Sequence, residues 1–353
     1  MPARVVLLSA FATPMRSGAE ACSEEISRAL GDRYNITIVT ARMRRSLPRR
    51  ETLPGDVKLR RIGLGFPIDK WLFPFLAPFT VWRLHPQIIH AVLESFAGLT
   101  LVFCRFLCPR AKRILTCQST NTTFLVGFMH RFPHRLTAIS STLVERAERF
   151  GRKDVIQIPN GLNLRDIPKM TKVQGRVLFV GRLESMKGVD TLLKAFAAMG
   201  PLIRERAVLR IIGEGSLRPE LEALVKELKI ADRVTFLGYI PSPAVYREFA
   251  QAEIFCGLSR SEALGNVFIE AQAAGCAVIA TRIQGIPDIV KDGATGILVP
   301  VDDIPKAKDA LERLIIDSTL RMKIAQAGRF SAQDYDWATI AEQYAEVYEG
   351  ILA

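Results

Sequence analysis

The sequence predicts an α/β protein that contains two doubly wound parallel sheets, one in each half of the chain. Short apolar runs of strand length alternate with segments of helical spacing along the whole sequence, a pattern typical of parallel sheets covered by helices. A length of 353 residues suits two domains, and a hydrophobic content of 49% is sufficient for two packed cores. A polar stretch with a proline, at residues 161–175, separates the two halves.

The order of the apolar runs defines the expected strands. In the first half they lie near residues 5–10, 36–40, 57–62, 87–91, 113–117, 136–139 and 155–158. In the second half they lie near residues 176–181, 207–212, 234–237, 253–256, 277–280 and 296–299. The tail has the spacing of a helix at Trp337, Ile340, Tyr344, Val347, Tyr348 and Ile351. We therefore predict a first domain at 1–165, a second at 166–330 and a final helix within 331–353.

Cysteine usage and hydropathy argue against several protein classes. The six cysteines have no metal-type spacing, and we expect reduced thiols in a cytoplasmic protein. We expect no cleavable leader, because the first strand begins near Arg4. The apolar stretch 88–108 is interrupted by His90, Glu94 and Arg105, so we expect no transmembrane helix there.

The positive charge is concentrated in the first half of the chain. Residues 1–165 hold 25 Lys and Arg against 11 Asp and Glu, a net charge of +14, whereas the whole chain carries +12. The nearby segment 62–82 is rich in Trp and Phe but is broken by prolines, and it could be buried or lie on a membrane surface. A basic run is usually a solvated loop. Beside such a segment it also predicts peripheral contact with anionic lipids at the inner face of the plasma membrane, and no motif indicates nucleic acid.

Two carboxylates stand eight residues apart in the second half, at Glu262 and Glu270. An apolar strand precedes them, and Gly265 and Asn266 mark the start of a helix whose free N–H groups favour an anion. We expect Glu262 in a loop at a strand end and Glu270 about two turns into the helix. Such a pair is usually a solvated surface feature. Its spacing also suits a nucleoside diphosphate sugar, which has hydroxyl groups at both ends and negative charge in the middle.

A second constellation lies about 80 residues upstream, where an apolar strand ends at Gly181. The following turn carries Arg182 and Lys187, and a helix begins near Gly188. Ligands of open parallel sheets bind at the carboxyl ends of the strands. Both cations are therefore placed where a phosphate would lie. The alternative is that both are solvated surface cations, as most Lys and Arg side chains are.

Together these segments resemble the retaining glycosyltransferases of the GT-B fold, specifically glycosyltransferase family 4, also described as glycosyl transferases group 1. The resemblance covers nearly the whole chain and is strongest from residue 159 to residue 296. The matching fragments are Asn160-Gly161, Gly213-Glu214-Gly215, residues 233–239, residues 275–281, Gly285-Ile286-Pro287-Asp288 and residues 292–299. Their order and spacing carry the resemblance. It implies two Rossmann-like domains that face a central cleft, with the final helix crossing back to the first domain.

The resemblance also implies an activity and a set of contacts. A sugar would pass from a UDP- or GDP-sugar, with retention at the anomeric carbon, to a lipid-linked or polysaccharide acceptor in cell-envelope glycan synthesis such as that of lipopolysaccharide. Arg182 and Lys187 would stabilise the leaving diphosphate, Glu262 would contact the donor sugar, and Glu270 the ribose. Further substrate contacts are implied for Gly18, Ala19, Asn160, Gly213, Tyr239, Gly265, Asn266 and Val267. This interpretation requires no divalent metal and no cofactor.

Two positions depart from the family pattern. The first-domain loop commonly has two glycines, and this chain has Ser17-Gly18, which narrows the space for the donor. Many members have a histidine beside the sugar, and Gln118 takes its place here. Glutamine forms hydrogen bonds but cannot take a proton, so the proton of the acceptor would pass elsewhere, for example to the leaving phosphate. His90 is a further candidate for substrate contact, although a lone histidine at a strand end is more often structural.

Other functions remain open on the sequence alone. The GT-B fold also serves nucleotide-sugar 2-epimerases, which would need further acid–base groups in the first domain, and Gln118 argues against them. Phosphorylases are far longer and hold pyridoxal phosphate on a lysine, for which the sequence has no signal. A degenerate transferase could bind a nucleotide sugar without turnover. The joint presence of Arg182, Lys187, Glu262 and Glu270 argues against that reading.

Overall fold

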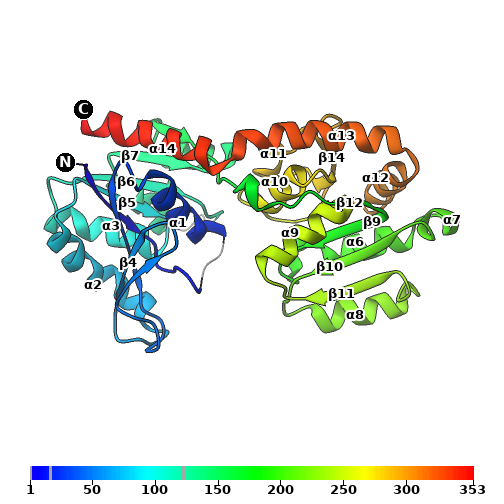
Figure 1. Ribbon diagram of the computed structural model, residues 1–353, viewed down its shortest axis with the longest axis horizontal. Helices are drawn as coiled ribbons and strands as arrows, with labels where there is room; N and C mark the ends of the chain where they lie inside the picture. The colour runs from blue at the N-terminus through cyan, green and yellow to red at the C-terminus, as the bar shows by residue number, and fades with distance from the viewer. Residues whose placement is uncertain (1, 16–17, 121–123) are drawn as a thin grey trace. The chain divides into compact units, whose positions relative to one another are not determined.

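A computed structural model describes residues 2–15, 18–120 and 124–353 (Figure 1). The chain forms two compact units, one made of Met1–Gly161 with Trp337–Ala353 and the other of Leu162–Asp336. The first unit ends at Gly161, four residues before the predicted boundary, because the N–H of Leu162 already donates to the carbonyl of Tyr335 at 2.8 Å within the second unit. The final helix belongs to the first unit, as the resemblance implied.

The first unit contains an eight-stranded sheet in the order β3-β4-β2-β1-β5-β6-β7-β8. Its strands are β1 (Arg4–Leu8), β2 (Asn35–Ala41), β3 (Arg50–Leu53), β4 (Val57–Ile62), β5 (Ile88–Val92), β6 (Lys112–Cys117), β7 (Arg135–Ala138) and β8 (Val155–Gln157). All neighbouring pairs are parallel except β3 with β4. The predicted parallel sheet is confirmed, and the antiparallel edge strand β3 is an addition that the sequence analysis lacked.

Helices cover both faces of this sheet. They are α1 (Gly18–Leu30), α2 (Asp69–Leu84), α3 (Phe96–Leu107), α4 (Phe124–Met129), α5 (Ser141–Arg149) and α14 (Trp337–Leu352). Successive side chains of a strand point to opposite faces, so Val5 and Leu7 pack with α1 and α14, whereas Val6 and Leu8 pack with α2 and α3. The six apolar positions predicted for the tail helix are all buried in the first of these cores.

The second unit contains a six-stranded parallel sheet in the order β11-β10-β9-β12-β13-β14. Its strands are β9 (Val173–Val180), β10 (Val208–Ile212), β11 (Val234–Gly238), β12 (Ala252–Gly257), β13 (Ala277–Thr281) and β14 (Gly296–Val299). Its helices are α6 (Val189–Ala197), α7 (Pro201–Arg204), α8 (Arg218–Glu227), α9 (Ser242–Gln251), α10 (Asn266–Ala273), α11 (Ile286–Ile289), α12 (Ile304–Ile316) and α13 (Ser318–Ser331). Three short 3₁₀ turns, η1 (Leu164–Asp166), η2 (Ser185–Lys187) and η3 (Ala332–Tyr335), also occur here.

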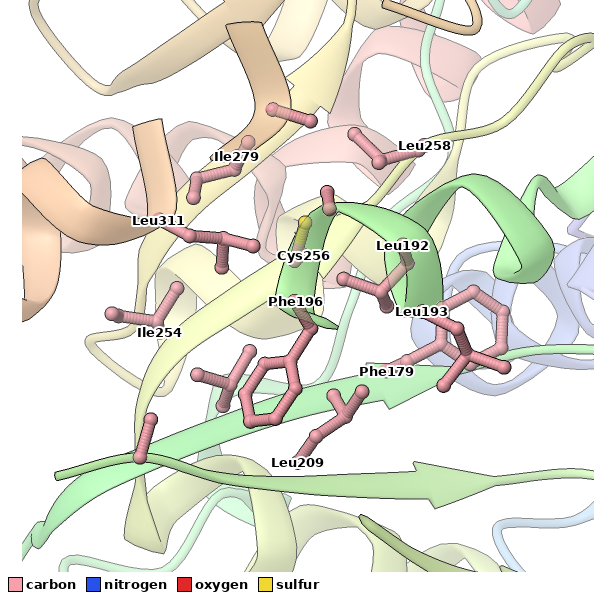
Figure 2. Close-up of a cluster of buried hydrophobic side chains, with 14 of the residues drawn as sticks. Phe179, Leu192, Leu193, Phe196, Leu209, Ile254, Cys256, Leu258, Ile279 and Leu311 are labelled. Carbon is pink, nitrogen blue, oxygen red and sulfur yellow. The ribbon is translucent and has the colours of Figure 1, made fainter. Parts of the chain in front are cut away.

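One core of the second unit lies under helix α6. Figure 2 shows Leu192, Leu193 and Phe196 of α6 over the strands, with Phe179 of β9 and Leu209 of β10 below them. Burying such large apolar side chains stabilises the unit by about 1.5–3 kcal/mol for each side chain. The core fixes α6 against β9, and it therefore fixes the turn that joins them.

Candidate functional site

The two predicted constellations meet at one edge of the second sheet. β9 and β12 are neighbours and run parallel, so their carboxyl ends lie side by side. The turn after β9 carries Arg182 and the short η2 turn with Lys187, and the loop after β12 carries Glu262. The sheet topology thus brings together side chains that stand 75 residues apart in the sequence. This edge is where ligands bind in open parallel sheets.

Lys187 and Glu262 form an ion pair across these two loops. Their side chains are 16% and 17% exposed, so both charges are largely shielded but still reach the surface. The backbone N–H of Glu262 donates to Oε1 of Gln284 at 2.6 Å, which ties the loop to the segment after β13. Lys187 and Glu262 are therefore positioned by the loops that follow three neighbouring strands, β9, β12 and β13.

Arg182 lies at the surface beside this pair. Its side chain is exposed, and its Nη2 lies 3.8 Å from Sδ of Met186. An exposed guanidinium keeps its donors available for a phosphate, which it can bind with two parallel hydrogen bonds. Arg182 and Lys187 are thus two cations on one turn, with one paired to a carboxylate and the other facing solvent.

Glycines allow the loops at this edge to pack closely. Gly188 precedes α6 with a φ of 61°, and a Cβ at this position would lie 2.0 Å from the carbonyl oxygen of Leu258. Gly213 follows β10 with a φ of 132°, and a Cβ there would lie 1.9 Å from the carbonyl oxygen of Gly181. No other residue type fits these positions without backbone movement. The predicted contact residue Gly213 therefore shapes the loop around β9.

Helix α10 begins where the sequence predicts. Gly265 precedes it with a φ of 91°, and Asn266 and Val267 are its first residues. The first N–H groups of a helix have no partner within the helix and carry partial positive charge. This helix start lies four residues after Glu262, and a Cβ at Gly265 would lie 3.1 Å from Cγ of Glu262, so the helix start adds backbone donors near the Lys187–Glu262 pair.

Glu270 lies only four residues after the start of α10, which is about one helical turn. The predicted depth of two turns is therefore wrong, although the predicted helix start at Gly265-Asn266 is correct. The side chain is partly buried. Loss of hydration raises the pKa of this carboxyl to about 7. Within the described ranges its carboxylate forms no hydrogen bond or ion pair, which leaves it available to ligand hydroxyl groups.

Tyr239 lies at the end of β11, on the same edge of the sheet. It follows Gly238, whose carbonyl accepts the N–H of Gly213 at 2.9 Å. The tyrosine side chain is 79% exposed. The structure thus places Gly213 and Tyr239 on adjoining strand ends, with an aromatic ring open to solvent.

Arg260, which was not predicted from the sequence, bonds to three segments at this edge: the η2 turn, the start of α6 and the loop after β14. Its guanidinium donates to Asp190 at 2.8 Å, to Asp302 at 2.9 Å and to the carbonyl of Ser185 at 2.6 Å. Its N–H donates to the carbonyl of Met186 at 2.8 Å. Hydrogen bonds to the two aspartates hold the pKa of Arg260 above its usual range. The only sequence signal is its position two residues before Glu262.

In the first unit, Gln118 directly follows β6, and Asn160 lies next to it. Both are buried, and Nδ2 of Asn160 lies 3.4 Å from Oε1 of Gln118. The Glu94 carboxylate accepts the backbone N–H groups of Gln118 at 2.7 Å and Ser119 at 3.2 Å. Nε2 of Gln118 has no partner among the described residues. A buried donor without a partner is costly in a folded protein, and it is a suitable donor to a ligand hydroxyl.

Two further predicted positions of the first unit, Gly18 and Ala19, lie at the start of α1. Gly18 is its first residue and Ala19 follows, so these residues form a helix start rather than a loop. The neighbouring Ser17, which departs from the family pattern, lies outside the described residues. A helix start offers the same kind of N–H groups as α10 does.

His90 is a core residue, and the prediction that it contacts substrate is not supported. The side chain is fully buried. Its Nδ1 lies 2.8 Å from the hydroxyl of Tyr348, and its Nε2 lies 2.6 Å from the hydroxyl of Thr116. Burial lowers the pKa of His90 to about 3. Both ring nitrogens are occupied, so His90 links β5 to α14 and β6.

A buried cluster of potential metal ligands lies beside Gln118. Glu94, Cys117 and His130 place three potential ligand atoms within 4.8 Å of one another. Arg146 contacts the same Glu94 carboxylate. Although burial opposes ionisation, the hydrogen bond from His130 and the charge of Arg146 lower the pKa of Glu94. The charge of Glu94 is therefore balanced by protein side chains, and the cluster supports the turn that carries Gln118.

Comparison with known proteins agrees with this geometry. Residues 163–330 match the family described as glycosyl transferases group 1. The chain is 31% identical to a phosphatidyl-myo-inositol mannosyltransferase of Mycobacterium leprae, over 56% of this chain and 54% of that protein. It therefore spans about half the length of the curated relatives it matches.

Solved structures match the chain over nearly its whole length. A sucrose-phosphate synthase from Thermosynechococcus elongatus aligns with a TM-score of 0.87 at 20% identity, covering 99% of each chain. HepE of Anabaena, solved in complex with UDP and glucose, aligns with a TM-score of 0.80 at 18% identity, covering 99% of this chain and 100% of that one. These likenesses show that the two units together have the GT-B fold.

Proposed function

Residues 163–330 match the glycosyl transferases group 1 family, and from this match we propose that the chain is a retaining glycosyltransferase that uses a nucleotide-sugar donor. The observation that carries the proposal is the meeting of Lys187 and Glu262 at neighbouring strand ends, beside the exposed Arg182 and the start of α10. This arrangement supplies cations, backbone N–H groups and a carboxylate within one small area. A nucleoside diphosphate sugar has the complementary groups.

In this proposal Arg182 and Lys187 stabilise the leaving diphosphate. The bond between the anomeric carbon and the diphosphate oxygen breaks, and its electron pair stays on the diphosphate. Placed cations and helix N–H groups act on the charge that develops there, and such electrostatic stabilisation is commonly the largest contribution to catalysis. Because the positive charge comes from side chains, the proposed reaction requires no divalent metal.

The carboxylates and the first unit would contact the rest of the reactants. Glu262 would bind hydroxyls of the donor sugar, and Glu270 would bind the ribose diol. Gln118 would donate from its unpaired Nε2 to the sugar. Since glutamine cannot take a proton, the proton of the acceptor hydroxyl would pass to the leaving phosphate as the new bond forms on the same face of the sugar.

The donor and the acceptor are proposed by class. HepE is solved with UDP and glucose, which supports a UDP-sugar, with a GDP-sugar as the alternative. The mycobacterial relative is named for a lipid substrate, phosphatidyl-myo-inositol, which supports a lipid-linked acceptor rather than a free polysaccharide. Such an acceptor fits a protein that works at the inner face of the plasma membrane in cell-envelope glycan synthesis.

The test is donor cleavage by the purified full-length chain. A panel of UDP-, GDP- and ADP-sugars is incubated with the protein and membrane extract, and released nucleoside diphosphate is measured. We expect release from one donor, its loss in Glu262→Ala, and its retention in the control Glu220→Ala, which alters an exposed residue of α8.

Two other results would favour the alternatives. Binding of a nucleotide sugar without release from any donor would indicate a degenerate, non-catalytic protein. Isomerisation of the donor sugar at C2 would indicate an epimerase.

A further inference from the structure

The outward face of helix α2 is aromatic. Trp71, Phe75, Phe79 and Trp82 are between 49% and 61% exposed. They recur at intervals of four, four and three residues and therefore form one stripe along the helix. The opposite face of α2 is apolar as well, but its residues Phe73, Ala77 and Val81 are fully buried against the sheet. The helix is thus apolar on both faces, and only one of them is covered.

Neighbouring segments extend this aromatic stripe. α3 packs beside α2 (Figure 1), with Trp71 against Phe96 at 5.0 Å between ring centroids and Phe75 against Phe103 at 5.2 Å. The turn before α2 adds three exposed apolar side chains, Leu64, Phe66 and Ile68. We refer to the four aromatic residues of α2 with these three as the α2 face.

The turn that carries these residues is held in place from inside. The buried carboxylate of Asp69 accepts the N–H groups of Leu64, Gly65 and Phe66 at 3.0, 2.6 and 3.2 Å. One of the few acidic residues in this region is therefore used to shape the apolar turn, and its charge does not reach the surface.

The part of the chain that contains the α2 face carries mainly positive charge. Residues 57–144 contain 11 Lys and Arg but only two acidic residues, Asp69 and Glu94. Both acidic residues are buried. Arg45 lies over the ring of Phe66 at 4.4 Å, and Lys70 lies 6.0 Å from the ring of Trp71. Aromatic side chains flanked by Lys and Arg are typical of segments that lie in the interface of an anionic bilayer.

A basic cavity adjoins the carboxyl end of the helix. Trp82 lines it together with Arg4, Arg110 and Lys112, and its volume is about 620 Å³. Three cations around one hollow are suited to a phosphate group. The stripe and the cavity together present an apolar surface and an anion site on one side of the first unit.

We propose that the α2 face lies in the interface of an anionic lipid bilayer, with its aromatic side chains among the acyl chains and the basic residues at the headgroup phosphates. The proposed contact is peripheral. Among the described residues, no helix is long and apolar enough to cross a bilayer. This inference specifies the membrane contact within the proposed function, but it concerns docking and does not depend on the transfer reaction. A second copy of the chain or a partner protein on this face is an outcome that the test distinguishes.

The natural tryptophans allow a direct test. The chain has three, and Trp71 and Trp82 lie on the α2 face whereas Trp337 is buried. The full chain is mixed with phosphatidylcholine vesicles with or without phosphatidylglycerol, and fluorescence and co-sedimentation are recorded. We expect a blue shift and co-sedimentation with the anionic vesicles, weakened by salt. Trp71→Phe with Trp82→Phe should keep the binding and lose the shift.

Matched variants distinguish binding through the α2 face from nonspecific binding through any exposed apolar side chain. Phe75→Ser with Phe79→Ser should reduce vesicle binding at least tenfold. The control Leu202→Ser with Phe330→Ser removes two side chains of the second unit that are 78% and 75% exposed, and it should bind as wild type does. Unchanged release of nucleoside diphosphate from the donor in both double variants shows that they are folded.

A charge variant tests the electrostatic part independently of the apolar contacts. Lys70→Glu with Arg83→Glu should weaken binding to anionic vesicles with little effect on the fold, because neither residue is fully buried. Vesicle binding that is unchanged in both α2 variants would overturn the proposal. A dimer that dissociates in Phe75→Ser with Phe79→Ser, without any vesicle binding, would overturn it in favour of a second copy.

Discussion

The ammonium of Lys187 and the carboxylate of Glu262 form an ion pair that joins the loops after β9 and β12. Because this ion pair lies at the proposed donor site, it would have to open when a donor binds. In the proposed reaction, Lys187 would turn toward the diphosphate when a donor binds, and Glu262 would turn toward the sugar hydroxyls. Each side chain keeps the other in position before the donor binds. Removal of one leaves the partly shielded charge of the other without its partner.

Lys187→Ala should lower the turnover of donor cleavage by about 10²–10³-fold, because one of the placed charges opposite the leaving group is lost. The affinity for the nucleoside diphosphate should fall less. Steady-state kinetics and calorimetric titration with the product nucleotide measure these two effects. Lys194→Ala, an exposed cation on α6, is the matched control. A wild-type rate in Lys187→Ala would remove this residue from the diphosphate site.

Arg260 is expected to act as a positioning residue for Lys187. It bonds to the carbonyl groups of Ser185 and Met186, which belong to the same short turn as Lys187. Arg260→Gln should lower kcat tenfold or more with a smaller change in KM for the donor. Arg260→Lys keeps the charge but loses the fork that reaches several acceptors at once, and it should restore part of the rate. Equal activity of Gln, Lys and Arg at this position would contradict the positioning role.

The raised pKa of Glu270 predicts an unusual dependence of stability on pH. Its pKa is raised by burial from 4.5 to about 7 in the folded chain. The folded state therefore holds the proton more tightly than the unfolded state, and stability is lost as the pH rises from about 4.5 through 7. Glu270→Gln has no such loss, so it should be more stable than wild type at pH 8, by on the order of 1–3 kcal/mol, and similar to wild type at pH 4.

Denaturant unfolding across this pH range measures the difference, with the exposed Glu220→Gln as the control. The same titration bears on function, since the ionised carboxylate is the stronger acceptor of ribose hydroxyls. Donor affinity should therefore rise with pH near 7 in wild type and stay low and flat in Glu270→Gln. A stability difference that does not vary with pH would show that folding does not raise the pKa of Glu270.

His90 should give stability the opposite dependence on pH. Its pKa is lowered by burial to about 3, so the folded state excludes a proton that the unfolded state takes up near pH 6.5, and stability is lost as the pH falls between these values. Tyr348→Phe, which removes a hydrogen bond to Nδ1, should cost about 1 kcal/mol without changing kcat. Thermal unfolding and donor cleavage measure the two quantities. A loss of kcat with normal stability would return His90 to the active site.

The sequence predicts the sheets well because their strands are continuous apolar runs between turn residues. β3 (Arg50–Leu53) was missed because it is polar and lies at the sheet edge, where only Leu53 is buried. The apolar segment that forms α2 could not be assigned to the core or the surface, because its two faces are equally apolar and only packing against the sheet distinguishes them.

The candidate site also contains residues that could be predicted from the sequence and residues that could not. Arg182, Lys187 and Glu262 could be placed at the same edge of the sheet because each lies in a local motif after an apolar strand. Arg260 was missed because its partners Asp190 and Asp302 lie 70 and 42 residues away in the sequence. His90 was misplaced for a similar reason, since the residue that covers its Nδ1 is Tyr348, 258 residues away. Local patterns indicate which groups lie at strand ends, and long-range contacts decide which groups are buried.

Gly188 gives the last prediction, because it joins the turn that carries Lys187 to helix α6. Gly188→Ala should destabilise the second unit by about 3 kcal/mol or more, since a Cβ would lie 2.0 Å from the carbonyl oxygen of Leu258, and backbone must move to admit it. Gly293→Ala is the matched control: its φ of 71° is close to the 61° of Gly188, but a Cβ there meets no atom within 4 Å.

The left-handed conformation alone should cost about 1–2 kcal/mol in the control. Thermal unfolding of both variants measures the difference, and donor cleavage below the melting temperature shows whether the turn has shifted. We expect Gly188→Ala to lose both stability and turnover, and Gly293→Ala to lose only the smaller amount of stability. Equal destabilisation of the two variants would mean that the contact with Leu258 does not constrain the turn, and the rigid placement of Lys187 would then rest on Arg260 alone.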